Sequence, residues 1–310
     1  MISVAAIVVT RNRPELLKRC LAAIDAQTHP ARYLLVVDNA SEKPTRQLLA
    51  AETARRDASF QLIQLEENSG GAGGFHAGMR ASLALPCTHM WLMDDDCEPD
   101  SRALEELMAA AAVVGEDAVL GGNIFDLNGE SINVQPIAMR VGANGVPQYP
   151  LHLEHGLIEM CTLTFVSFLI STTIVRKAGL PLKEFFIWGD DTEYSLRVAR
   201  FAKLYQVGRS KIVHLRSGDA SQSIFKERTY ENIWKYRLYY RNMIYIIVKY
   251  DGVLSPPMGR FLFRAFKEMI FSLRSGKLIL AKWAAVTYGL GAGVGFSMRM
   301  AKKNTDSLPD

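Results

Sequence analysis

Three consecutive carboxylates, Asp94, Asp95 and Asp96, directly follow the apolar run Met90–Met93. Clustered acids at the end of a strand are costly, because like charges within about 4 to 6 Å disfavour one another's ionised forms unless a cation neutralises them. Oxygen ligands suit a hard divalent ion such as Mn2+ or Mg2+, which keeps coordination positions open for substrate phosphates. The triplet therefore predicts a metal site, with an acidic, solvated turn as the alternative.

A second acidic pair, Asp190 and Asp191, comes two residues after Trp188 and leads into a helical pattern. The helix dipole keeps a carboxylate ionised at a helix start, where it can accept a proton from a sugar hydroxyl. Helix capping alone would explain one of the two aspartates. His214 ends the strand-like run Lys211–Val213 and could offer its imidazole to the metal, although a lone histidine there also suits a structural role.

A glycine-rich run precedes a helical pattern in the first third of the chain. After Asn68 it contains four glycines in five positions, namely Gly70, Gly71, Gly73 and Gly74. Glycine lets the backbone approach a ligand closely, and the N–H groups at a helix N-terminus favour an anion. The run predicts a diphosphate site, with a flexible structural turn as the alternative. It matches neither a P-loop nor a dinucleotide fingerprint.

Polar residues also end the first two predicted strands. Thr10 and Arg11 close the first strand, and Asp38 closes the second. Asp38 could accept hydrogen bonds from a nucleobase or a ribose, as acids at strand ends do in nucleotide-binding folds. An Asx turn that caps the next helix would explain the same residue.

These residues need a scaffold, and the first third of the chain predicts one by alternating strand-like and helical patterns. The predicted strands are Val4–Val9, Tyr33–Val37, Gln61–Leu65 and one ending at Asp94, and the predicted helices are Pro14–Ala26, Thr45–Arg55 and Gly74–Ala84. This alternation indicates an α/β fold, Rossmann-like, with a mostly parallel central sheet and flanking helices. Because ligands bind at the carboxyl ends of such strands, we expect the polar segments to converge on one crevice. The run Phe165–Ile170 fits either a strand or a helix.

The pattern becomes helical and aromatic after His214, so we expect a first domain at 1–222 and a C-terminal α-helical segment at 223–310. From Lys226 onward the chain has 15 Lys and Arg against 6 Asp and Glu, whereas the preceding part has 21 against 26. A basic, aromatic segment suits an anionic membrane surface or an acidic partner, with a solvated helix as the alternative. We expect no nucleic-acid partner.

The stretch Leu278–Met298 is long enough to cross a bilayer. It carries Lys282 and four glycines, so an interfacial or packed helix is predicted in preference to a transmembrane one. The four cysteines show no CxxC spacing, which favours a reducing compartment. The N-terminal apolar run lacks a basic leader, and we therefore expect a cytoplasmic protein.

The order of these segments resembles family 2 glycosyltransferases of the inverting type with a GT-A fold, over roughly residues 1 to 220. Four segments carry the resemblance: Val8–Arg13 is similar to the opening strand, Val36–Ser41 to the base-binding strand, Asp94–Asp96 to the DXD motif, and Gly189–Glu193 to the (E/D)D-x-(D/E) segment. The run from Asn68 to Met79 and the tryptophan before the acidic pair are similar to the galactofuranosyltransferase subgroup. Rhamnosyltransferases share much of this framework.

The resemblance implies a role for each residue. Asp94, Asp96 and His214 would bind Mn2+ or Mg2+, and Asp191 would be the catalytic base. The donor-binding residues would be Thr10, Arg11, Asp38, Asn68, Gly70, Gly71, Gly73, Gly74 and Asp95. Trp188 would stack on the acceptor sugar beside Asp190, whose role stays open because many members have glutamate there.

The sequence thus predicts a metal-dependent inverting glycosyltransferase that transfers galactofuranose from UDP-galactofuranose to a growing, lipid-linked cell-surface glycan. Its aromatic, basic tail would place it on the inner face of the cytoplasmic membrane. The rival donor is dTDP-rhamnose. A non-catalytic nucleotide-sugar or glycan-binding protein would be expected to lose the metal acids or the base, and a nucleotidyltransferase would be expected to have a glycine-rich loop near the first strand. The chain keeps both sets of acids and has no such loop after Arg11.

Overall fold

The computed structural model describes residues 2–215, 223–274 and 276–306. The chain divides into two compact units, which are described separately below. The first unit contains Met1–Glu184 and Asp191–Gly218, and the second contains Phe185–Asp190 and Asp219–Asp310. Residues 185–190 therefore pack with the C-terminal helices, although the sequence assigns them to the first domain.

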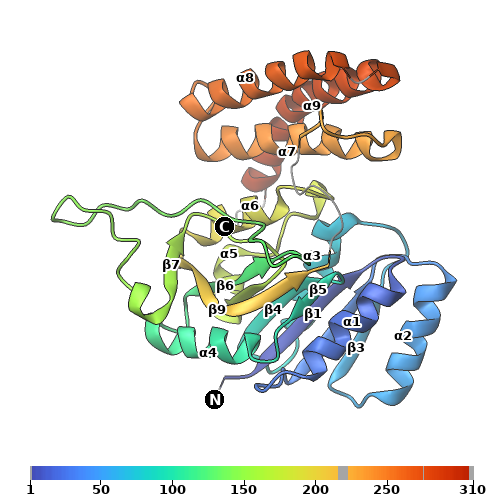
Figure 1. Ribbon diagram of the computed structural model, residues 1–310, viewed down its shortest axis with the longest axis vertical. Helices are drawn as coiled ribbons and strands as arrows, with labels where there is room; N and C mark the ends of the chain where they lie inside the picture. The colour runs from blue at the N-terminus through green and yellow to red at the C-terminus, as the bar shows by residue number, and fades with distance from the viewer. Residues whose placement is uncertain (1, 216–222, 275, 307–310) are drawn as a thin grey trace. The chain divides into compact units, whose positions relative to one another are not determined.

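A nine-stranded mixed sheet forms the centre of the first unit (Figure 1). Its strands are β1 (Val4–Thr10), β2 (Tyr33–Asp38), β3 (Phe60–Gln64), β4 (His89–Asp94), β5 (Cys97–Pro99), β6 (Val119–Phe125), β7 (Leu157–Met160), β8 (Phe168–Ser171) and β9 (Leu204–His214). The order is β3-β2-β1-β4-β8-β6-β9-β5, with β7 on β9. The strands β3, β2, β1 and β4 run parallel, while β8 is antiparallel to both its neighbours. The run Phe165–Ile170, which fits either a strand or a helix by its sequence, thus contributes to strand β8.

Helices cover both faces of this sheet. They are α1 (Pro14–Asp25), α2 (Lys43–Arg55), α3 (Gly70–Ser82), α4 (Ala103–Val114), α5 (Thr172–Ala178) and α6 (Asp190–Val198). Apolar side chains of α1, α2 and α4 share one buried cluster with one face of the sheet, and those of α3, α5 and α6 share a second cluster with the other face. The predicted α/β fold with flanking helices is confirmed.

The start of α3 differs from the sequence expectation. The helix begins at Gly70, so the four glycines lie in its first turns and do not form a loop before it. The reason is packing, because a Cβ atom at Gly74 would lie 2.4 Å from Val9 Cγ1, and one at Gly78 would lie 2.5 Å from Ile7 Cγ2. Glycine at these two positions lets α3 lie directly on β1, which outweighs the low helix propensity of glycine.

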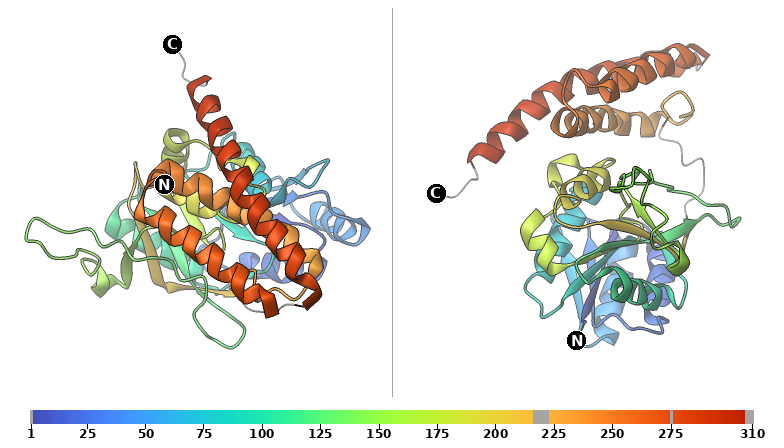
Figure 2. Two further views of the ribbon diagram at one scale, coloured as in Figure 1. Left: turned by 90° about the horizontal axis from the view of Figure 1, so that it is seen from above. Right: turned by 90° about the vertical axis from the view of Figure 1, so that its left-hand side faces the viewer.

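The second unit is helical, with α7 (Ile233–Tyr250), α8 (Pro256–Phe271) and α9 (Ile279–Asp306). Both views in Figure 2 show these helices side by side. Ser255 caps α8 by accepting a hydrogen bond from the amide of Met258 at 3.3 Å. Tyr236, Tyr240 and Phe261 belong to the shared core of the three helices. Among the described residues, one helical stretch, Gly276–Lys302, is long and apolar enough to cross a membrane, with a mean hydropathy of 1.3.

Candidate active site

The carboxyl ends of the parallel strands bring the predicted polar segments together. Thr10 lies opposite Asp38 across the β1–β2 pair, and Val9 lies opposite Asp94 across the β1–β4 pair. The amide of Asn12 donates to Ser41 Oγ at 3.0 Å, which joins the loops after β1 and β2. The expected convergence of these strand ends is therefore observed.

Asp95 bonds to several groups at this edge. Its Oδ2 accepts hydrogen bonds from Thr10 Oγ1 at 2.7 Å and from the amide of Arg11 at 3.4 Å. Its Oδ1 accepts from Arg13 Nη1 at 3.1 Å, and the same nitrogen lies 2.9 Å from Asp96 Oδ2. One guanidinium thus bridges two adjacent carboxylates, a role for Arg13 that the sequence reasoning missed.

The pKa values of Asp95 and Asp96 are shifted in opposite directions. Burial raises the pKa of Asp95 to about 6, even though Arg13 and Thr10 favour its ionised form. Burial would also raise the pKa of Asp96, but the His214 imidazole and the Arg13 guanidinium outweigh this effect and lower it. Asp96 is therefore the more readily ionised of the two, as a metal ligand requires.

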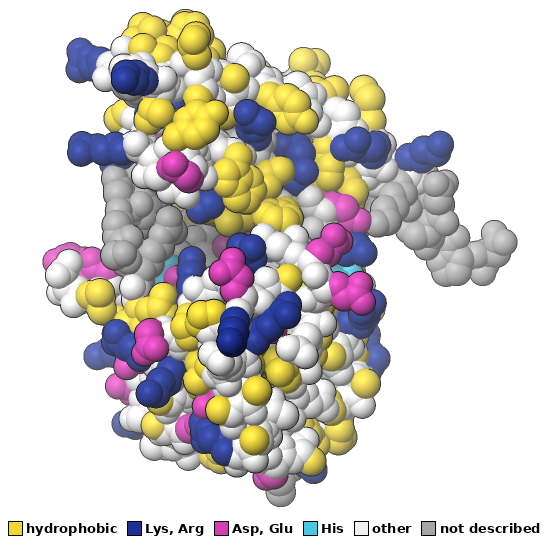
Figure 3. Space-filling view, turned by 90° about the vertical axis from the view of Figure 1, so that its right-hand side faces the viewer, with side chains coloured by type: hydrophobic (Ala, Val, Ile, Leu, Met, Phe, Trp, Pro, Cys, Tyr) yellow, Lys and Arg dark blue, Asp and Glu magenta, His cyan; other side chains and the backbone are white. Residues whose placement is uncertain are grey.

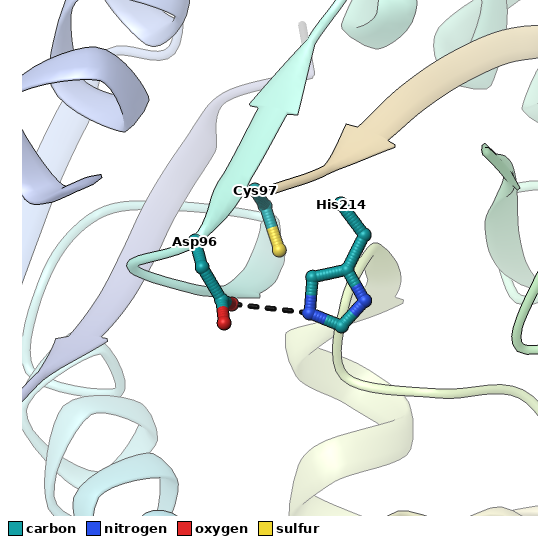
Figure 4. Close-up of side chains that lie close together, drawn as sticks. All are labelled: Asp96, Cys97 and His214. Atoms are coloured by element: carbon teal, nitrogen blue, oxygen red, sulfur yellow. Dashed lines mark hydrogen bonds and ion pairs between the residues drawn. The ribbon is translucent and has the colours of Figure 1, made fainter. Parts of the chain in front are cut away.

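His214, from the end of β9, faces this acidic corner. Its Nε2 lies 3.2 Å from Asp96 Oδ1, and the two side chains point toward one another with Cys97 beside them (Figure 4). Asp96 and His214 are 118 positions apart in the chain. They meet because β5 pairs with β9, which sets Cys97, the neighbour of Asp96, opposite His214. Asp96 and His214, both predicted as ligands, are thus in contact.

Among the described residues, the group whose ligand atoms could hold a metal is Asp96, Cys97 and His214, with these atoms within 4.8 Å of one another. Asp94, the third predicted ligand, is not a member of this group. Cys97 was not predicted, and its only sequence signal is its position directly after the triplet. Burial raises the pKa of the Cys97 thiol well above its usual range, and sulfur is a poor ligand for Mn2+ or Mg2+.

Asp38 bonds within its own turn but does not form the Asx turn that was the alternative for it, because the bond spans three residues and the N-cap of α2 is Glu42. Its Oδ1 accepts a hydrogen bond from the amide of Ser41 at 2.9 Å. The neighbouring Asn39 instead joins the strand end to the glycine run, because its Nδ2 donates to the carbonyl of Gly70 at 2.8 Å and its Oδ1 accepts from the amide of Ser69 at 2.8 Å. Asn39 was missed, although its position after a strand-ending aspartate was the available signal.

The N-terminus of α3 lies at this same edge. Gly70 has a φ of 69°, and its amide donates to Asn68 Oδ1 at 3.0 Å. A Cβ atom at Gly71 would meet nothing within 4 Å, whereas one at Gly73 would lie 2.3 Å from Ser69 Oγ. Gly71 therefore leaves open space at the helix start, as an approaching anion would need.

The acidic pair begins helix α6, as predicted. Asp191 Oδ1 accepts hydrogen bonds from its neighbour Thr192, at 2.7 Å from the amide and 3.3 Å from Oγ1. Burial raises the pKa of the Asp191 carboxyl even though these bonds favour its ionised form. A carboxyl with a raised pKa is a better proton acceptor when ionised, which suits a general base.

Buried polar contacts hold α6 in place. Ser195 Oγ exchanges hydrogen bonds with the amide and the carbonyl of Leu163, both at 3.0 Å. Glu193, the last acid of the motif, pairs with Arg197 Nη2 at 2.8 Å. Arg197 in turn donates to the carbonyl of Ala178 at 2.7 Å. Glu193 thus serves the anchoring of the helix, while Asp191 lies in its first turn.

Trp188 precedes the acidic pair in a constrained loop. Its φ is 62°, a left-handed conformation that tryptophan rarely adopts. The indole packs edge-on against Tyr236 and Tyr239 of α7, with ring centroids 5.0 and 6.3 Å apart. The Trp188 side chain therefore packs with the helices of the second unit.

The comparisons with known proteins identify the family of the chain. A family model described as "Glycosyl transferase family 2" matches residues 5–175, which is more than half of the chain. The chain is 32% identical to "Galactofuranosyltransferase GlfT1" of Mycobacterium tuberculosis over 204 residues, and 38% identical to the protein of that name from Mycolicibacterium smegmatis over 201 residues. Each alignment covers 64% of this chain and 65% of the relative, so the match spans just under two thirds of these proteins.

Solved structures share the fold. The crystal structure of GalNAc-T7 with UDP, GalNAc and Mn2+ matches with a TM-score of 0.63 at 15% identity, covering 100% of this chain and 58% of that one. The S. aureus TarS 1-349 complex with UDP matches with a TM-score of 0.54 at 12% identity, covering 97% and 92%. The expected GT-A fold with a C-terminal helical part is thereby confirmed. Asp191 and His214 lie beyond the residues that the family model matches.

Proposed function

Because the chain belongs to glycosyl transferase family 2, we propose that it is a metal-dependent, inverting galactofuranosyltransferase that uses UDP-galactofuranose as donor and a cell-surface glycan, lipid-linked in the cell, as acceptor. The donor is supported by the relatives named galactofuranosyltransferase. The observation that carries the proposal is the contact between Asp96 and His214 at the strand edge where Thr10, Asp95 and Asp38 meet.

The residues at the acidic corner fit a divalent metal. Asp96 Oδ1 and His214 Nε2 offer one oxygen and one nitrogen at 3.2 Å from each other, a donor set that Mn2+ accepts. Arg13 places a positive charge between Asp95 and Asp96, which supports an affinity of this corner for cations. Asp96 and His214 would hold the ion, with Asp94 as the proposed third ligand. When bound, the ion would supply charge stabilisation to the leaving diphosphate.

The remaining steps belong to side chains and backbone of this chain. Asp191, ionised, would accept the proton of the acceptor hydroxyl as its oxygen attacks the anomeric carbon from the face opposite the nucleotide. The bond to the diphosphate breaks in the same displacement, which inverts the configuration. Backbone amides at the start of α3, beside Gly71, would donate to the departing diphosphate. Asp38 and Arg11 would hold the nucleoside.

Thermal unfolding in the presence of nucleotides tests the donor. We expect UDP at saturating concentration to raise the unfolding temperature by about 5 °C when Mn2+ is present, and chelator to remove most of this shift, because a ligand stabilises only the state that binds it. dTDP should shift it less. A larger shift with dTDP than with UDP would replace galactofuranose by rhamnose as the donor sugar.

We also propose that the second unit attaches the enzyme to an anionic membrane surface. Helix α8 has one face that is buried and one that is open to solvent. Met258, Phe261 and Ala265 lie on the buried face, and the open face also carries apolar side chains. That open face includes Leu262, Phe263, Phe266, Ile270 and Phe271, of which Phe263 is 63% and Phe266 59% exposed. An exposed apolar face of this kind marks a surface that interacts with a membrane or another protein.

Basic side chains accompany this apolar face. Lys267 Nζ lies 5.8 Å from the ring centroid of Phe263 and 5.9 Å from that of Phe271. Arg260 and Arg274 are exposed on the same helix and just after it. Figure 3 shows hydrophobic side chains over the helices of this unit with Lys and Arg side chains among them. Apolar insertion combined with positive charge is the pattern that binds anionic lipid.

Sedimentation with lipid vesicles tests this attachment. The double change Phe263→Ser and Phe266→Ser should lower binding to anionic vesicles by at least about tenfold, because both rings lose their contact with the lipid. The matched control is Phe201→Ser, an exposed phenylalanine of the first unit, which should bind as the wild type does. Equal binding of the wild type to neutral and anionic vesicles would remove the basic side chains from the proposal.

A further inference from the structure

Asn242, in the middle of α7, contacts the loop that leads to the proposed catalytic base. Its side chain is fully buried, and its Nδ2 lies 3.0 Å from the carbonyl oxygen of Phe185, 3.1 Å from that of Ile187 and 2.8 Å from that of Trp188. One amide group thus donates to three backbone carbonyls within four residues. An amide nitrogen has two hydrogens, so one of them is shared between two acceptors.

The orientation of this amide is determined by its other neighbour. Asn242 Oδ1 accepts from Arg241 Nε at 2.9 Å and from Arg241 Nη2 at 2.7 Å. A guanidinium only donates and a backbone carbonyl only accepts, so the oxygen must face Arg241 and the nitrogen must face the loop. Arg241 Nη2 also donates to the carbonyl of Phe185 at 3.1 Å. Asparagine meets both demands, whereas an aspartate would place a negative charge against three carbonyl oxygens.

The loop itself needs such support, because its backbone is in an unfavourable conformation. Phe186 has a φ of 65°, Trp188 of 62° and Gly189 of 89°. Left-handed conformations at two bulky aromatic residues persist only when the surroundings determine them, and they concentrate at functional sites. Asn242 also fills the space beside Gly189, where an added Cβ would lie 3.6 Å from Asn242 Cβ.

We propose that Asn242 is a positioning residue for catalysis, which holds the backbone of the loop 185–189 and thereby the start of helix α6, where Asp191 lies. The role rests on the proposed function, since Asp191 is two residues beyond the loop and its placement follows from the backbone that Asn242 binds. Neither Asn242 nor Arg241 would touch donor or metal. The loss of Asn242 should therefore impair turnover and leave donor binding intact.

The first measurement is steady-state kinetics of Asn242→Asp. We expect kcat to fall by about 100-fold with the KM for UDP-galactofuranose changed by less than about twofold, because a displacement of about 1 Å in a reacting group costs this much. The matched control is Asn232→Asp, where the same substitution falls on a residue that accepts a hydrogen bond from Lys235 at 2.9 Å. Its kcat should match that of the wild type.

The second measurement needs no turnover. In hydrogen exchange, the amides of residues 186–192 of Asn242→Asp should exchange at least about tenfold faster than in the wild type, while the amides of the central sheet stay protected. If Asn242→Asp does not fold, Asn242→Ser takes its place, because a hydroxyl retains one donor and adds no charge. The same local exchange and the same loss of kcat are expected of it.

The outcomes separate this inference from the proposed function. Unchanged kcat, loss of donor affinity in parallel with kcat, or faster exchange throughout the sheet would each overturn the positioning role. If the wild type transfers no sugar but the loop amides alone exchange faster in the variant, the proposed function fails and the loop-holding role of Asn242 stands. If neither turnover nor exchange changes, Asn242 has no such role.

Discussion

Asp191→Asn is expected to lower kcat by about 1,000-fold, because it removes the carboxylate that we propose as the acceptor of the hydroxyl proton. The amide has nearly the same shape and still has an oxygen for the amide of Thr192, which now bonds to Asp191 Oδ1 at 2.7 Å. Helix α6 should therefore keep its start, and Mn2+-dependent binding of UDP should be unchanged. Single-turnover assays and UDP titrations with and without Mn2+ measure the two effects separately.

The pH dependence of kcat in the wild type is a second test of the role of the Asp191 carboxyl. Burial raises the pKa of Asp191, and the base must be ionised to accept a proton. Activity should thus fall as the pH drops through this raised pKa, which means that the acidic limb of kcat lies above the ordinary value of about 3.9 for aspartate. The residual activity of Asp191→Asn should lack this limb.

A matched control for Asp191→Asn is Asp57→Asn, at an exposed aspartate in the turn before β3. It changes the same groups away from the acidic edge and should retain full turnover. If Asp191→Asn transferred sugar at nearly the wild-type rate, another group would have to accept the proton, and the assignment of the base would be wrong.

The strand edge of the site follows closely from the sequence. Val4–Val9 and Met90–Met93 are continuous apolar runs, which is typical of strands buried on both faces in a parallel sheet. Strands of that kind end where polar residues begin, so Thr10, Asp38 and the aspartate triplet could be assigned to one edge before any coordinates. The register confirms this, since Thr10 lies opposite Asp38 and Val9 opposite Asp94.

Arg13 could not be found in the same way, because a periodic pattern places the backbone and not the end of a long side chain. The guanidinium reaches Asp95 and Asp96 from the residue before Pro14, after a left-handed turn at Asn12 with a φ of 57°. Only the pairing of β1 with β4 brings those carboxylates within its reach. A basic residue between a strand end and the proline that starts a helix was the one available signal.

Tertiary packing also decided two features that local preference could not. Glycine disfavours helices, so the sequence places the start of α3 after its glycine run, yet close contact with Val9 and Ile7 makes helix the better solution from Gly70 onward. The role of Asn242 depends on three backbone carbonyls more than 50 residues earlier in the chain. A polar residue in an aromatic helix indicates burial with a partner but does not identify the partner.

Asp96→Ala should lower the affinity for UDP in the presence of Mn2+ by at least about 100-fold, because Asp96 is a proposed direct ligand and loss of a ligand costs at least as much as loss of a residue that only orients one. The change leaves Arg13 paired with Asp95 at 3.1 Å, so the guanidinium keeps a carboxylate partner and the fold should persist. His214→Ala should have the same effect, since the two residues are 3.2 Å apart and would bind one ion.

The design of this experiment separates loss of metal from loss of shape. Asp100→Ala is the matched control, because Asp100 is exposed in the turn after β5 and its Oδ1 accepts only from the amide of Arg102 among the hydrogen bonds of the described residues. That variant should bind UDP as the wild type does, and chelator should weaken its binding to the same extent. In Asp96→Ala, by contrast, UDP affinity should be low both with Mn2+ and with chelator. A wild-type affinity that is identical under the two conditions would mean that Asp96 and His214 hold no ion, and the positive charge opposite the diphosphate would have to come from Arg13 and Arg11.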